Sequence, residues 1–207
     1  MRIGIAYTRV CSGNTGESSQ TSAYLVRMPH LDTLLDRERA GEAIDFLFFW
    51  GHRPAADGRV GASCLSQWWR SGFDVDGEHY RTAEHYMMAA KARLFGDEDI
   101  ARAVLAADGP DQAKSLGRKV RGFDDARWRE HRYDVVVRAN EAKFGQHPAL
   151  AAYLRGTGDA VLVEASPVDS IWGIGLTATS PDARRPSSWP GLNLLGFALV
   201  DVRARLR

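Results

Sequence analysis

An uninterrupted helix-forming run in the centre of the chain constrains its fold more than any other feature. Residues 83–95 read AEHYMMAAKARLF, a segment rich in strong helix formers. Thr82 precedes the run as a candidate helix cap, and Gly96 follows it as a stop signal. The sequence therefore predicts one helix here with both of its ends marked.

Weaker signals on either side of this run predict more helices than strands. Apolar residues at helical spacing and turn residues at the ends predict helices over 100–107, 112–120, 125–144, 149–155 and 193–206. Runs of β-branched and aromatic residues predict strands over 44–50, near 73–77, over 161–165 and over 171–175. Strands and helices do not alternate as in βαβ units. The sequence thus predicts an α+β fold, a helix-dominated single domain with a small β-sheet.

The length and the charge balance set the scale of the molecule. A chain of 207 residues, 44% of them hydrophobic, can bury a substantial core without disulfide or metal staples. Residues 1–40 lack sustained periodicity apart from a short helix predicted at 31–39, so we interpret 1–40 as an appendage and 41–207 as the domain. A net charge of +1 favours a small molecule or a single flipped base over tracking along a nucleic-acid duplex.

Cysteine and hydropathy patterns bear on compartment and cofactors. Cys11 and Cys64 are too few and too far apart for a disulfide framework or a zinc motif. The apolar run 3–7 is too short for a signal sequence, and no stretch reaches the length of a membrane span. We therefore expect a cytoplasmic protein without a membrane association, a required metal or a bound cofactor.

Glu84 and Lys91 lie on one face of the predicted central helix. Met87 and Met88 share that face with them, so both charged groups project along an apolar stripe, where desolvation perturbs pKa values. The two positions are separated by about 10 Å along a helix axis, a spacing that allows them to flank a substrate. The alternative is that the helix dipole merely favours Glu84 and that Lys91 extends into solvent.

A basic row follows in the next helices. Lys114, Arg118 and Arg121 recur at i, i+4 and i+7, and Gly117 permits close approach of a ligand. Arginine matches the geometry of phosphate with paired donors, so this row is a candidate phosphate or pyrophosphate site. The alternative is a solvated helix face.

Aromatic and acidic residues form a third candidate. Trp128 lies on the predicted long helix, while Asp169 and Trp172 lie in a tight turn of the segment SPVDSIWG. A carboxylate beside indole rings suits a site that stacks a flat base and stabilises positive charge developing on a ribose. The alternative is a tryptophan in the core and an aspartate that caps a turn.

Several common catalytic templates do not occur in the sequence. There is no GxxxxGK[ST] phosphate loop, no HExxH zinc motif and no GxSxG nucleophile elbow. The usual nucleotide-binding and hydrolase readings are therefore disfavoured.

Taken together, these residues carry a family resemblance over about 44–206. Its blocks, in order, are FFWGH (48–52), YRTAEHYMMAAKA (80–92), AKSLGR (113–118), Asn140 with KFGQ (143–146), LVEASPVDSIWGIG (162–175) and NLLG (193–196). With these blocks the chain resembles the NADAR or YbiA-like family of N-glycosidases. The combination of blocks in order, rather than any one of them, makes the match specific.

The resemblance implies cleavage of a bond between ribose C1′ and a nitrogen. The expected substrate is nucleotide-like: an ADP-ribosylated guanine, or a phosphoribosyl-aminopyrimidine intermediate of riboflavin synthesis. The resemblance makes Glu84, Lys91 and Asp169 the candidate catalytic residues. The candidate substrate-binding residues are Trp50, His52, Tyr86, Lys114, Arg118, Trp128, Trp172 and Asn193.

Two departures from the family pattern leave the substrate branch open. Arg81 stands where a proline often precedes the threonine, and the FFWGH block replaces an Asn-Phe segment of other members. A different class of function also stays open at this point, a module that binds NAD or ADP-ribose without turnover. A purely structural partner protein is the third reading.

Overall fold

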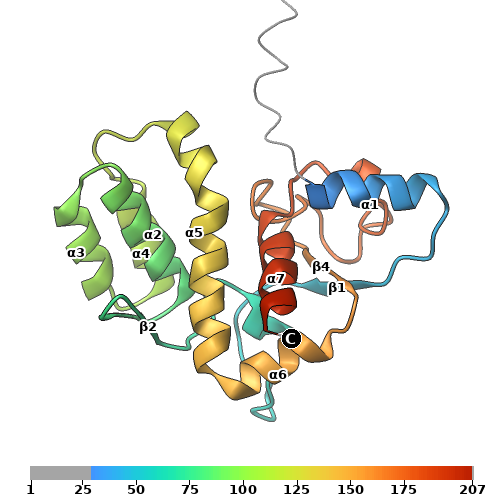
Figure 1. Cartoon of the computed structure of the whole chain (residues 1–207), viewed down its shortest axis with the longest axis horizontal. Coiled ribbons are helices and arrows are strands. Elements are labelled where there is room, and N and C mark those ends of the chain that lie inside the picture. The colour runs from blue at the N-terminus through green and yellow to red at the C-terminus, as the bar shows by residue number, and fades with distance from the viewer. Residues whose placement is uncertain (1–28, 207) are drawn as a thin grey trace, which may run out of the picture.

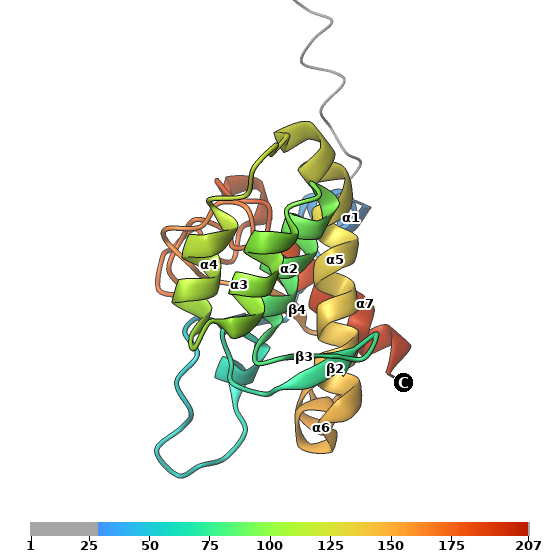
Figure 2. The ribbon, with the colours of Figure 1, turned by 90° about the vertical axis from the view of Figure 1, so that its left-hand side faces the viewer.

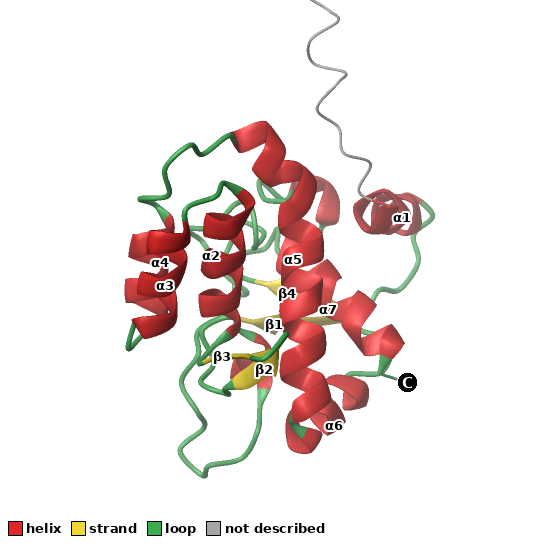
Figure 3. Ribbon diagram, turned by 60° about the vertical axis from the view of Figure 1, so that its left-hand side comes forward, coloured by secondary structure: helices red, strands yellow, loops and turns green. Residues whose placement is uncertain are grey.

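The computed structural model describes residues 29–206, and within them the chain is mostly helical. The elements in chain order are α1 (Pro29–Arg39), β1 (Phe46–Phe49), the 3₁₀ turn η2 (Ala62–Leu65), β2 (Phe73–Val75), β3 (Glu78–Tyr80), α2 (Ala83–Leu94), α3 (Glu98–Ala106), α4 (Pro110–Gly117), α5 (Asp125–Gln146), α6 (Pro148–Gly156), β4 (Val161–Glu164), η3 (Pro186–Ser188) and α7 (Leu194–Arg205). The predicted α+β class, dominated by helices with little strand, is confirmed (Figure 3).

The long helix α5 divides the molecule. On one side of it α2, α3 and α4 pack together, and Figure 2 shows these helices beside α5. On its other side lie α7, the β1–β4 pair and α1 (Figure 1). Helix α2 contacts α3, α4 and α5, while α7 contacts α5 and β4. The two halves of the molecule therefore meet in the region of space between α2 and β4.

The predicted helices form because their ends are capped as the sequence indicates. Thr82 Oγ1 accepts the backbone N–H of His85, and the side chains of Asp97 and Asp124 accept backbone N–H groups at the starts of α3 and α5. Such bonds satisfy donors that the first turn of a helix leaves free. Helix α4 ends at Gly117 and so stops earlier than the predicted 112–120.

The strands make two separate pairs. β1 runs parallel to β4, with Phe46 opposite Val161 and Phe49 opposite Glu164. β2 and β3 form an antiparallel hairpin whose turn places Asp76 and Gly77 at positive φ.

The predicted strand at 171–175 is wrong. The carbonyls of Ile171, Trp172 and Gly173 accept N–H groups from 193–195, at the start of α7, instead of pairing with a neighbouring strand. The segment is a loop folded against the N-terminal end of α7, with the N–H of Ile174 donating to the carbonyl of Glu164. Of its β-branched residues Ile174 is fully buried and Ile171 is 41% exposed, so the strand-like composition reflects neither sheet pairing nor uniform burial.

Asn193 connects this loop to the sheet. It adopts positive φ, which asparagine tolerates better than most residues. Its Oδ1 accepts the N–H of Glu164 at 3.0 Å, and its Nδ2 donates to the carbonyl of Leu162 at 2.9 Å. The side chain is fully buried and ties the edge of β4 to the beginning of α7.

Helix α1, predicted at 31–39, packs against the rest of the described chain. His30 Nε2 lies 2.8 Å from Asp201 Oδ1 on α7, and Leu34 is buried against Phe46 and Phe197. Glu38 accepts the backbone N–H of Ser187. The predicted division between 1–40 and 41–207 stays a prediction, and most of that appendage lies outside the described residues.

Gly196 allows α7 to approach β4 closely, and replacing it is expected to destabilise the fold. A Cβ at this position would lie 2.0 Å from the carbonyl oxygen of Leu162, a backbone atom that cannot rotate away. Gly196→Ala should lower the free energy of unfolding by about 3 kcal/mol or more, measured by urea denaturation. Gly145→Ala is the control, because α5 has open space there, and it should be neutral or stabilising by up to about 1 kcal/mol. Equal effects of the two substitutions would contradict the close approach.

Candidate active site

A cavity of about 540 Å³ opens where the two halves of the molecule meet. Helices α2 and α4 form one side of it, and the end of β4, the loop that follows β4 and the segments after β1 and η2 form the other. The side chains that line it and bear on its chemistry are Trp50, His52, Ser66, Gln67, Trp68, Glu84, Met87, Met88, Lys91, Lys114, Arg118, Glu164, Ser166, Asp169, Ile171 and Trp172.

This cavity brings together most of the candidate residues singled out in the sequence. All three candidate catalytic residues line it, and so do the candidate substrate-binding residues Trp50, His52, Lys114, Arg118 and Trp172. They come from α2, α4 and three separate loops, so their proximity is a property of the tertiary fold.

Three candidate residues do not line the cavity. Tyr86 borders a separate cavity of about 400 Å³ together with Arg138. Trp128 is buried in the main core, with the Nζ of Lys91 5.9 Å from its ring centroid. Asn193 makes the backbone bridge described above. In this structure none of these three side chains forms part of the cavity wall.

Glu84 is the most deeply buried acid of the cavity. Its side chain is only 3% exposed, and its Oε1 has no hydrogen-bond partner within the described part of the chain. Burial raises the pKa of Glu84 to about 7, while the positive charge of Lys114 and a hydrogen bond from Trp68 oppose that rise. A pKa near neutral pH suits Glu84 to the role of a general acid or base.

Glu164 is a cavity residue that the sequence analysis did not single out. It is the last residue of β4, and its Oε2 is shielded from solvent without a protein partner among residues 29–206. Burial, together with the negative charges of Asp169 and Glu84, raises the pKa of Glu164 to about 8, while the positive charge of Lys114 opposes that rise. One signal was available in the sequence, because Glu164 is the only charged residue in the predicted strand VLVEA.

Asp169 is held by the turn in which it lies. Its Oδ1 accepts the N–H of Ile171 at 2.9 Å and the N–H of Trp172 at 2.8 Å. The carboxylate thus orders the loop that carries Trp172 into the cavity wall. Asp169 both caps this turn and lines the cavity, so the two interpretations of the sequence are compatible.

Lys91 is half-buried beside aromatic rings. Its Nζ donates to the carbonyl of Gly117 at 2.9 Å and lies 4.2 Å from the ring centroid of Phe123. Burial lowers the pKa of Lys91, and Asp125 partly opposes this effect. The amine therefore does not simply extend into solvent, which was the alternative for this residue.

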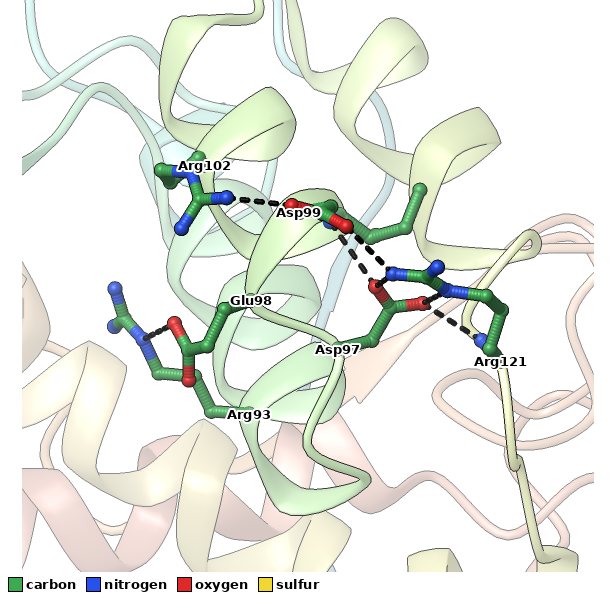
Figure 4. A network of polar contacts seen from close by, with 7 residues as sticks. Arg93, Asp97, Glu98, Asp99, Arg102 and Arg121 are labelled. Atoms are coloured by element: carbon green, nitrogen blue, oxygen red, sulfur yellow. Dashed lines mark hydrogen bonds and ion pairs between the residues drawn. The ribbon is translucent and has the colours of Figure 1, made fainter.

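The predicted basic row is divided by the end of α4. Lys114 and Arg118 line the cavity, whereas Arg121 lies beyond the helix and pairs with Asp97 and Asp99. Figure 4 shows Arg121 in this network, where its N–H groups reach both carboxylates. Arg121 therefore anchors the chain after α4 to the α2–α3 junction and is not part of the candidate anion site.

The segment after η2 is a second part of the wall that sequence reasoning missed. Gln67 accepts the backbone N–H of Glu84 through its own carbonyl, and its Oε1 accepts a hydrogen bond from Asn140 on α5. The buried ammonium of Lys143 donates to the carbonyls of Cys64 and Ser66. These bonds from α5 hold the segment against the start of α2.

Among residues 29–206 no group of three or more His, Cys, Asp or Glu side chains is arranged to hold a metal ion. None of the helices in that range is both long enough and apolar enough to pass through a membrane.

Comparisons with known proteins identify the family. The model of the NADAR domain matches residues 48–207, so this chain belongs to the NADAR domain family. N-glycosidase R617 of Acanthamoeba polyphaga mimivirus is 41% identical over 167 residues, which are 78% of this chain and 96% of that protein. The riboflavin biosynthesis protein PYRR of Zea mays is 32% identical over 142 residues, which are 64% of this chain and 21% of that protein.

A solved structure agrees with the fold. The NMR structure of the Escherichia coli protein YbiA superposes with a TM-score of 0.62 at 28% identity, over 79% of this chain and 86% of that one. The predicted resemblance to the NADAR or YbiA-like family is thereby confirmed.

The burial of Glu84 predicts a specific dependence of stability on pH. An unfolded glutamate loses its proton near pH 4.5, whereas folded Glu84 retains it up to about pH 7. Between these values the unfolded state binds fewer protons, so the free energy of unfolding falls as the pH rises. From pH 4.5 to 8 this fall is about 3 kcal/mol for wild type relative to Glu84→Gln.

Urea denaturation at a series of pH values measures this difference. Glu141→Gln serves as the control, because Glu141 pairs with Arg205 on the surface, away from the cavity. Its difference from wild type should vary much less over the same range. A wild type and Glu84→Gln that lose stability in parallel would show that Glu84 titrates normally.

Proposed function

We propose that this chain hydrolyses the N-glycosidic bond between C1′ of a phosphorylated ribose and the nitrogen of a base. Its membership of the NADAR family and the N-glycosidase relatives support a hydrolase of this type. The observation that carries the proposal is that one cavity joins three carboxyl groups, three cationic side chains and several tryptophans. Its volume of about 540 Å³ lies in the range typical of small-molecule sites.

The polarity of the cavity suggests how a phosphoribosyl group would lie. Lys114 and Arg118 offer donors to a phosphate, since arginine pairs with phosphate oxygens in a bidentate manner. Trp172 and Trp68 line the same cavity, and indole faces stack on flat bases. The Nζ of Lys114 lies 5.8 Å from the ring centroid of Trp68, so a phosphate on this cation and a base on the nearby rings would leave the sugar next to the acids.

The carboxyl groups can supply proton transfer and charge stabilisation. As the C1′–N bond lengthens, positive charge develops on C1′ and the ring oxygen, and a nearby carboxylate stabilises it. Glu84 or Asp169 takes the proton of the attacking water or stabilises this charge, while an acid protonates the departing nitrogen.

Lys91 has two chemically distinct roles open to it. Its ammonium can bind ribose or phosphate oxygens, or its neutral amine can attack C1′ and give an imine after the sugar ring opens. The lowered pKa of Lys91 increases the neutral fraction that the second role needs. Trp128 and Phe123 would position this amine through their rings in either case.

Two substrate classes fit the proposed reaction, an ADP-ribosylated guanine and the phosphoribosyl-aminopyrimidine intermediates of riboflavin synthesis. Similarity to a riboflavin biosynthesis protein supports the second class, although the match covers 21% of that protein. Trp50 lines the cavity and is exposed, so its ring is accessible to a larger base-bearing group, which suits the first class. A cytoplasmic location remains a prediction from the sequence.

Removing the charge of either acid should reduce turnover strongly. Glu84→Gln and Asp169→Asn are each expected to lower kcat by about 100- to 10,000-fold, the usual contribution of a general acid or base. Release of free base from both substrate classes, followed by chromatography, measures the effect. Circular dichroism checks that each variant is folded, and Glu141→Gln should retain wild-type turnover. Wild-type rates in both variants would remove these residues from the mechanism.

A sensor without catalytic activity would give a different pattern in the same assay. It would release no free base from either substrate class, yet calorimetry would show binding of ADP-ribose. That combination would replace the proposed hydrolase by a binding module.

The role of Lys91 is tested by chemical trapping. If the amine forms an imine with the opened sugar, borohydride reduction during turnover should leave a stable adduct on Lys91, seen by mass spectrometry of the intact protein. Lys91→Arg should then be inactive, because a guanidinium cannot form that imine. Absence of an adduct together with activity in Lys91→Arg would assign the residue to binding alone.

A further inference from the structure

Glu164 has a rigidly held backbone at the wall of the cavity. Its N–H donates to Asn193 Oδ1, and its carbonyl accepts the N–H of Ile174. In the parallel pair it lies opposite Phe49, immediately before the loop that carries Asp169. The direction in which its side chain leaves the strand is therefore set by three separate segments of the chain.

The alternation of the strand places this side chain on the cavity side. Leu162 packs in the main core, Val163 packs in the second core cluster against Phe46 and Ile174, and Glu164 returns to the side of Leu162. There it lines the cavity, with Oε2 shielded from solvent and unpaired within the described residues. A buried carboxyl oxygen without a partner costs free energy, so a ligand atom that bonds to it recovers that cost.

The charged groups around the cavity act differently on its two buried glutamates. The titratable groups that line it with Glu164 are Glu84 and Lys91 from α2, Lys114 from α4, Arg118 just after α4, His52 after β1, and Asp169. Lys114 favours the ionised form of both glutamates, and Asp169 favours the protonated form of both. Arg118 and the position in the first turn of α2 further favour the ionised form of Glu84. Asp169 and Glu84 both favour the protonated form of Glu164.

We propose that Glu164 is the acid that protonates the departing base nitrogen. This inference rests on the proposed N-glycosidase function and names a catalytic residue for it. Burial favours the protonated form of both glutamates, and Arg118 favours ionisation of Glu84 without a corresponding effect on Glu164, so Glu164 is the better suited of the two to hold a proton for donation. Asp169 is less suited to donate a proton, because its Oδ1 already accepts two backbone N–H groups.

The proposed step moves one electron pair and one proton to the leaving nitrogen and one proton from water to the base. The C1′–N bond breaks, its electron pair goes to the nitrogen, and the nitrogen takes the proton of the Glu164 carboxyl group. The oxygen of water bonds to C1′, and its proton passes to the carboxylate that acts as base. After the products leave, the base carboxylate releases its proton to solvent, and Glu164 takes up a proton from solvent. The acid step is the same if Lys91 rather than water attacks first.

A comparison of two leaving groups tests this role in Glu164→Gln. The first substrate is a phosphoribosyl-aminopyrimidine, whose base must be protonated as it leaves. The second is the same ribose phosphate with a pyridinium base, which leaves as a neutral molecule and needs no proton. We expect kcat of the variant to fall by about 100- to 10,000-fold on the first substrate and by less than about 10-fold on the second.

The pH profile gives an independent readout. In wild type, kcat on the aminopyrimidine substrate should fall as the pH rises through about 8, where Glu164 loses its proton. Glu164→Gln should lack this alkaline limb, whereas the control Glu141→Gln should retain both the limb and the wild-type rate. A purely structural role for Glu164 would lower the rate without changing the shape of the profile.

The outcomes separate this inference from the proposed function. If wild type cleaves the aminopyrimidine substrate, an equal loss on both leaving groups or an unchanged alkaline limb overturns the role of Glu164 alone. If wild type releases no base from any N-glycoside, the proposed function fails and the inference fails with it. Thermal denaturation of Glu164→Gln should show a folded protein at least as stable as wild type at pH 8, since the substitution removes a buried acid.

Discussion

The site depends on the buried amide of Asn193, which joins three segments that are distant in sequence. Its two hydrogen bonds reach the backbone on either side of Val163 and so fix the end of β4 relative to α7. The loop after β4 then closes on the same point, because the N–H of Asn193 donates to the carbonyl of Gly173. Such a residue acts on chemistry indirectly, through the backbone positions of Glu164 and Trp172.

This arrangement places acids where a stable core would have apolar groups. The unpaired oxygens of Glu84 and Glu164 lie inside one cavity, and burial raises the pKa of both side chains. Each group lowers the stability of the fold at neutral pH, as expected where a site is prepared for a substrate rather than for folding. The apolar contacts of α2 with α3, α4 and α5 offset that cost.

Local signals in the sequence were sufficient for most helices and insufficient for the partners of the loops. Thr82 and Gly96 mark the ends of α2 because capping depends on neighbouring residues only. The segment 171–175 has strand-like composition, but its hydrogen-bond partners lie at the start of α7 and leave no trace in local pattern. The family resemblance contributed Tyr86, yet a helix turns by about 200° over two residues, so Tyr86 faces away from Glu84.

The difference between helix and strand patterns explains why the sequence predicted Glu84 and Lys91 as site residues but not Glu164. A helix with charged groups among methionines is unusual enough to mark them, whereas one glutamate at the end of a strand is read as the strand meeting solvent. Only the tertiary structure shows that this strand end is covered by the α2–α4 side of the molecule. A charge at the end of a short buried strand is therefore a candidate for chemistry when the loop after it carries a second carboxylate, as Asp169 does here.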